Sequence, residues 1–131
     1  MQHTVSWHLL LGLALVACGG PDRETFVRDA NAACRDRATG QEALDAVDQD
    51  EMLPAVTVLY EQELERLRAL EPTDEDAARH ADWVRASEAV AAAWRDYSTD
   101  PSDRAARTRV LERFQRAARI AGQLGLSQCD A

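Results

Sequence analysis

Apolar residues recur at helical spacing along most of the chain, and the alternating apolar and polar runs that indicate β-strands are missing. The pattern predicts a first helix over about residues 23–39, which Gly40 stops or loosens, and a second over about residues 50–70. Residues 41–49 are left open between a loop and one or two helical turns. Pro54 is interpreted as tolerable in the second helix because it falls in the first turn.

Two more helices are predicted after turns that carry capping signals. Thr73 caps a third helix, with acidic residues in its first turn, where the helix dipole favours negative charge. Asp100 caps a fourth helix, which has Pro101 as its first residue and ends at Gly125. Because the connections between the last three helices are short, the sequence predicts an all-α domain, an antiparallel four-helix bundle over residues 23–131.

The N-terminal apolar run is of a different kind. Residues 5–17 are too few for a membrane span of about 20 residues, but they match the apolar core of a secretory signal peptide. The run ends in Leu15-Val16-Ala17-Cys18, which resembles the lipobox of bacterial lipoproteins: an aliphatic residue, a tolerant position, a small residue and a cysteine. The alternative, a buried N-terminal helix with an inert cysteine, is disfavoured because Gly19-Gly20-Pro21 would break it.

The lipobox resemblance implies a cellular location for the protein but no activity. In that family the signal peptide is removed, so residues 1–17 would be cleaved and the Cys18 thiol would carry a diacylglyceryl group. Residues 18–22 would be the lipid anchor and a short tether, and the bundle would be extracytoplasmic, held to a bacterial membrane by lipid. The segments FVRDANAAC, LERLRALEP and LGLSQC are also similar in layout to small uncharacterised exported lipoproteins, which implies a helical bundle and a disulfide but no catalytic residue.

Two cysteines remain if Cys18 carries lipid. In an oxidising compartment Cys34 and Cys129 can form a disulfide that nearly closes the mature chain, whereas the alternative is a pair of buried free thiols. In an up-down-up-down bundle the two cysteines meet in one of two ways. Either the first helix is displaced toward the end of the fourth, or the C-terminal tail folds back along the first helix.

Charge and composition disfavour several classes of function. The net charge is −8, which is a poor fit for binding nucleic acid, and repulsion from anionic headgroups leaves the lipid anchor as the expected membrane contact. The chain has no glycine-rich phosphate loop. His80 has Ala77 where a metal-binding bundle would place glutamate, and its pairing with Asp76 is interpreted as a surface contact. We therefore expect no metal site, no cofactor and no catalysis.

The third helix carries a stripe of aromatic and small residues that could hold a ligand. Its members recur at helical spacing: Trp83, Ser87, Val90, Trp94 and Tyr97. Small residues between large rings can leave a pocket for an apolar ligand between helices. The competing interpretation is plain core packing, which the same spacing also predicts.

The fourth helix is rich in arginine, whereas the second is acidic. Arg109, Arg113 and Arg116 share one face of it. They either pair with acids of neighbouring helices or form an anion-binding ridge for a cell-wall polymer or an envelope protein. The sequence therefore favours a non-catalytic binding or structural role in the cell envelope, and the alternative is a carrier or sensor of a small apolar ligand held between the helices.

Overall fold

The computed structural model describes residues 21–130, so the expected signal peptide and Cys18 lie outside the described residues. The described residues form four helices and no strand: α1 (Arg23–Glu42), α2 (Gln49–Ala69), α3 (Ala77–Thr99) and α4 (Arg104–Gln123). The predicted all-α bundle is confirmed. Within the described residues, no helix combines the length and the apolar character that crossing a bilayer requires.

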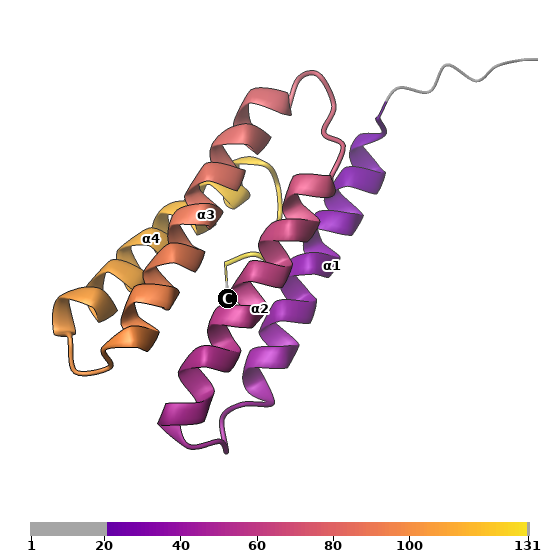
Figure 1. Ribbon diagram of the computed structural model, residues 1–131. Coiled ribbons are helices and arrows are strands. Elements are labelled where there is room, and N and C mark those ends of the chain that lie inside the picture. Colours follow the sequence, from indigo (N-terminus) through magenta and orange to yellow (C-terminus); the bar gives the residue numbers. More distant parts are fainter. Residues whose placement is uncertain (1–20, 131) are drawn as a thin grey trace, which may run out of the picture.

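The helices form two antiparallel hairpins, α1–α2 and α3–α4, which are joined where α2 packs against α3 (Figure 1). No Cα atom of α4 lies within 8 Å of a Cα atom of α1. The C-terminal tail, residues 124–130, runs between the two hairpins (Figure 1). Leu124, Leu126 and Cys129 of this tail are buried in the same core as the helices, so the tail is a fifth component of the bundle.

A disulfide joins the tail to α1. The Sγ atoms of Cys34 and Cys129 are bonded, and the Cα atoms of these residues are 5.1 Å apart. Just before the bridge, the Gln128 N–H donates a hydrogen bond to the side-chain oxygen of Asn31 at 3.1 Å. Of the two routes that the sequence left open, the chain takes the second, in which the tail folds back along the first helix.

The reversal that starts the tail depends on Gly125. Its φ of +77° is the left-handed conformation that favours glycine, and the Leu126 N–H then donates to the Ala121 carbonyl at 3.0 Å. The Arg23 guanidinium donates to the Leu124 carbonyl at 3.0 Å, which fixes the end of α4 beside the start of α1. The predicted stop at Gly125 is confirmed, and the turn it makes directs the tail into the core.

The predicted stop at Gly40 is wrong, because α1 continues through Gly40 to Glu42. A Cβ atom at Gly40 would come within 2.8 Å of a methyl carbon of Leu59 on α2. This glycine therefore allows a close approach of two helices and does not end one.

The predicted cap of α3, Thr73, lies three residues before the observed cap, Asp76. The Thr73 hydroxyl does accept a hydrogen bond from the Asp76 N–H, at 3.4 Å, but it stabilises a separate turn. The helix itself begins at Ala77.

The predicted start of α4 at Pro101 is wrong for a similar reason. The Asp100 carboxylate accepts from the Ser102 N–H at 3.2 Å and so holds a turn that contains Pro101. The residue that caps α4 is Asp103, whose carboxylate accepts from the Ala106 N–H at 3.0 Å.

Candidate functional site

The five residues predicted to form a ligand pocket on the third helix lie in two different places. Trp83, Ser87 and Val90 are buried in the core. The cavity beside them measures about 10 Å³, which is about the space of one water molecule. These three side chains therefore pack within the bundle and leave no ligand-sized cavity between them.

Trp94 and Tyr97, the other two, line an open groove at the end of the bundle where both hairpins turn. We call it the apolar groove; its volume is about 530 Å³. Its walls also come from the start of α2, with Met52 and Leu53, and from the first half of α4, with Leu111. Sequence reasoning missed these other walls because a stripe on one helix does not reveal which helices face it.

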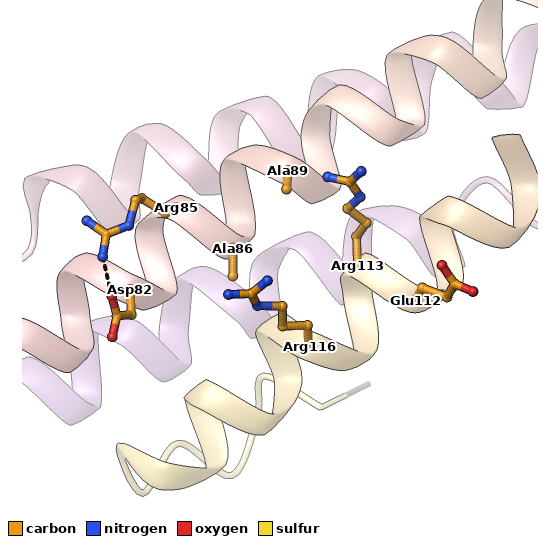
Figure 2. A pocket seen from close by; sticks show the side chains of 7 residues that line it. All are labelled: Asp82, Arg85, Ala86, Ala89, Glu112, Arg113 and Arg116. Carbon is orange, nitrogen blue, oxygen red and sulfur yellow. Dashed lines mark hydrogen bonds and ion pairs between the residues drawn. The ribbon is translucent and has the colours of Figure 1, made fainter.

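A second open groove of about 490 Å³ lies between α3 and α4. This arginine groove is lined by Asp82, Arg85, Ala86, Ala89, Glu112, Arg113 and Arg116. Figure 2 shows Arg113 reaching toward Ala89 and Arg116 reaching toward Ala86. The two alanines leave room beneath the guanidinium groups, so an anionic group could enter between them and α3.

The charges of the arginine groove are only partly compensated. Arg85 is ion-paired with Asp82 (Figure 2). Arg113 and Arg116 have no carboxylate oxygen within 4.0 Å in the part of the chain that the structure describes. A guanidinium group that has no carboxylate partner can donate two parallel hydrogen bonds to a carboxylate or a phosphate, and this groove contains two such groups.

Arg109 does not belong to the arginine groove, although the sequence grouped it with Arg113 and Arg116. It lies one turn nearer the start of α4, where its guanidinium is 3.9 Å from the carboxylate of Asp103. The structure thus brings together Arg113 and Arg116, two of the three predicted arginines. Arg109 lies instead beside Asp103, the N-cap residue of α4.

His80 is buried and is not the surface residue that the sequence predicted. It is 8% exposed, and its Nε2 donates to the Leu67 carbonyl at 2.8 Å, since a carbonyl can only accept. Its expected partner, Asp76, is instead ion-paired with Arg23. Among the described residues, no group of three His, Cys, Asp or Glu side chains is placed to hold a metal ion.

A buried ion pair that the sequence analysis missed lies between α1 and α2. Arg37 is 4% exposed, its Nε donates to Glu63 at 2.9 Å, and its guanidinium carbon lies 4.8 Å from the centre of the Tyr60 ring. Burial raises the pKa of the Glu63 carboxyl, an effect that the charge of Arg37 opposes. Burial likewise raises the pKa of the Tyr60 hydroxyl. The cavity that all three side chains share measures only about 10 Å³ and has no room for a substrate, so the ion pair belongs to the core.

Comparison with known proteins adds no family assignment. No family model, curated protein or solved structure matches this chain. The two grooves and the N-terminal sequence pattern are therefore the observations on which a function can be built.

Proposed function

We propose that the protein is an exported bacterial lipoprotein, held at a membrane by lipid on Cys18, that binds an envelope protein through the arginine groove. The proposed location is supported by the apolar run that ends in Leu15-Val16-Ala17-Cys18. The binding role is carried by one observation. Arg113 and Arg116 flank an open groove, and within the described residues neither has a carboxylate within 4.0 Å.

The position of the arginine groove suits a partner that approaches from the side. Lipid on Cys18 would lie a few residues before Arg23, at the end of the bundle where α1 begins. α3 and α4 run along the long axis of the bundle, and the groove lies between their middle turns (Figures 1 and 2). A partner could therefore reach both arginines without displacing the domain from the membrane.

The charges favour a protein over a polyanionic polymer as this partner. The chain has a net charge of −8, so a uniformly negative cell-wall polymer would be repelled by most of its surface. The groove itself mixes signs, with Asp82 and Glu112 among its lining residues. A protein surface that presents a carboxylate to the arginines and basic residues to these acids matches such a pattern.

The test is capture of a partner from envelope extracts by Arg113→Glu/Arg116→Glu and by a matched control, Arg35→Glu/Arg104→Glu. Both variants replace two exposed arginines. Each replacement of arginine by glutamate changes the net charge by −2, so both variants have a net charge of −12 in place of −8. We expect the groove variant to lose about tenfold or more of the captured partner, because two charge-assisted contacts are reversed. The control should capture the partner as the parent does.

Two outcomes would contradict the proposal. The first is a groove variant that is folded, as judged by circular dichroism, and still captures as much partner as the parent. The second is capture that survives protease digestion of the extract, which would mean that the arginines bind a polymer and not a protein.

A further inference from the structure

The apolar groove has the features of a ligand site and is independent of the arginine groove. It lies at the end of the bundle opposite the start of α1, since Gln41, in the last turn of that helix, is part of its lining. Both hairpin turns are at this end, which is the lower end in Figure 1. The two hairpins are joined at the other end by the α2–α3 connection, and the groove occupies the open end between them.

The walls of the apolar groove are apolar on three sides. Met52 and Leu53 come from α2, Trp94 and Tyr97 from α3, and Leu111 from α4. Leu111 is 56% exposed. A single exposed leucine is ordinary on a protein surface, but here it borders a concave surface that is also lined by four aromatic residues: Tyr60, Trp94, Tyr97 and Phe114.

The apolar groove contains a positive charge without a counter-charge among the described residues. Among residues 21–130, no Asp or Glu lines the groove, although the chain carries 23 of them. Arg107 lines it, and its guanidinium has no carboxylate within 4.0 Å in the described part of the chain. Arg107 is therefore the charged group that a ligand with an acceptor would contact in this groove.

We propose that the apolar groove binds a single-chain amphiphile with a carboxylate head, as a fatty acid has. Its alkyl chain lies against Trp94 and Leu111, and its carboxylate accepts hydrogen bonds from Arg107. The volume of about 530 Å³ falls within the range of about 300–1,000 Å³ that is usual for small-molecule sites. An alkyl ammonium would find no anion in the groove, and an alcohol of the same length would leave Arg107 without a counter-charge.

A second copy of this chain is a weaker candidate for the same groove. Each copy carries a net charge of −8, so two copies repel each other, whereas a ligand with one negative charge meets far less repulsion. The monoanionic amphiphile also matches the one charged side chain in the lining, Arg107.

The test is isothermal titration of the purified protein with decanoate, decan-1-ol and decyltrimethylammonium, each kept within its aqueous solubility and none above 1 mM. We expect decanoate to bind about tenfold more tightly than decanol, and Arg107→Ala to abolish that difference. Leu111→Glu, which places a carboxylate in the groove, should lower the affinity for decanoate at least tenfold. The matched control is Val58→Glu, because Val58 is 49% exposed on α2 and does not line the groove. It should bind decanoate as the parent does.

Quenching by 10-bromodecanoate locates the ligand. It should reduce the fluorescence of the parent but not that of Trp94→Phe, in which Trp83 remains in the closed core. Three results would overturn the proposal: no binding of decanoate up to 1 mM, equal binding of decanoate and decyltrimethylammonium, or full binding by folded Leu111→Glu. A dimer in sedimentation that Leu111→Glu dissociates would assign the groove to a second copy and would overturn it as well.

Discussion

Reduction of the Cys34–Cys129 disulfide is expected to lower the free energy of unfolding by about 4–5 kcal/mol. The bridge joins residues separated by 95 positions, so it restricts almost the whole domain in the unfolded state. It also holds the tail, residues 124–130, against α1. Urea denaturation followed by circular dichroism, with and without reductant, measures the difference.

The disulfide experiment is best done with Cys18→Ala in every sample, so that only the bridge responds to the reductant. Cys34→Ala/Cys129→Ala in the same background should behave like the reduced protein and should not respond to reductant at all. Equal urea midpoints for the oxidised and reduced forms would show that the helices and the buried Leu124 and Leu126 hold the tail without the bridge.

Replacing Arg37 by methionine is expected to cost about 3–5 kcal/mol of stability at pH 7. The substitution leaves Glu63, which is 9% exposed, as a buried charge without a partner. Arg37→Met/Glu63→Leu should recover most of the loss, because two apolar side chains of similar size remove both charges together. Thermal or urea unfolding of the two variants beside the parent is the measurement.

The pH dependence of this effect has a defined sign. Burial already raises the folded-state pKa of Glu63 above its ordinary value, and loss of Arg37 removes the larger of the two arginine charges that oppose this rise. A folded state that binds the proton more readily than the unfolded state gains stability as the pH falls. The destabilisation by Arg37→Met should therefore be largest at neutral pH and should shrink as the pH falls toward the ordinary value of 4.5. A pH-independent loss, or a double variant no more stable than Arg37→Met, would contradict the buried-charge explanation.

Local signals predicted the helices but not all of their ends. The spacing of apolar residues is a property of each helix alone, so the four helices and the turn at Gly125 could be found from the sequence. Thr73 and Asp100 are strong capping residues, but each is followed three residues later by another aspartate, Asp76 or Asp103. The choice between such successive caps depends on packing, because the start of a helix must place its apolar face on the core.

The buried ion pair could have been found from spacing, whereas the grooves could not. Arg37 lies three residues after Cys34 on the apolar face of α1, and Glu63 lies between Tyr60 and Leu67 on the apolar face of α2. Opposite charges at core positions of adjacent helices indicate a pair.

The two grooves depend instead on which helices meet and at what separation. The apolar groove needs walls from α2, α3 and α4 at the open end of the bundle. The arginine groove needs the small residues of α3 opposite α4. Residues on one face of a helix need not line the same groove: Arg109 and Arg113 lie on the same face of α4, but Arg109 lies beside Asp103.

Mass spectrometry of the protein extracted from membranes tests the proposed export and lipid anchor most directly. We predict a mature chain that begins at Cys18, carries a diacylglyceryl group on that residue, and has Cys34 linked to Cys129 in peptides prepared without reductant. A membrane-extracted chain that retains residues 1–17 and has an unmodified Cys18 thiol would contradict the proposal.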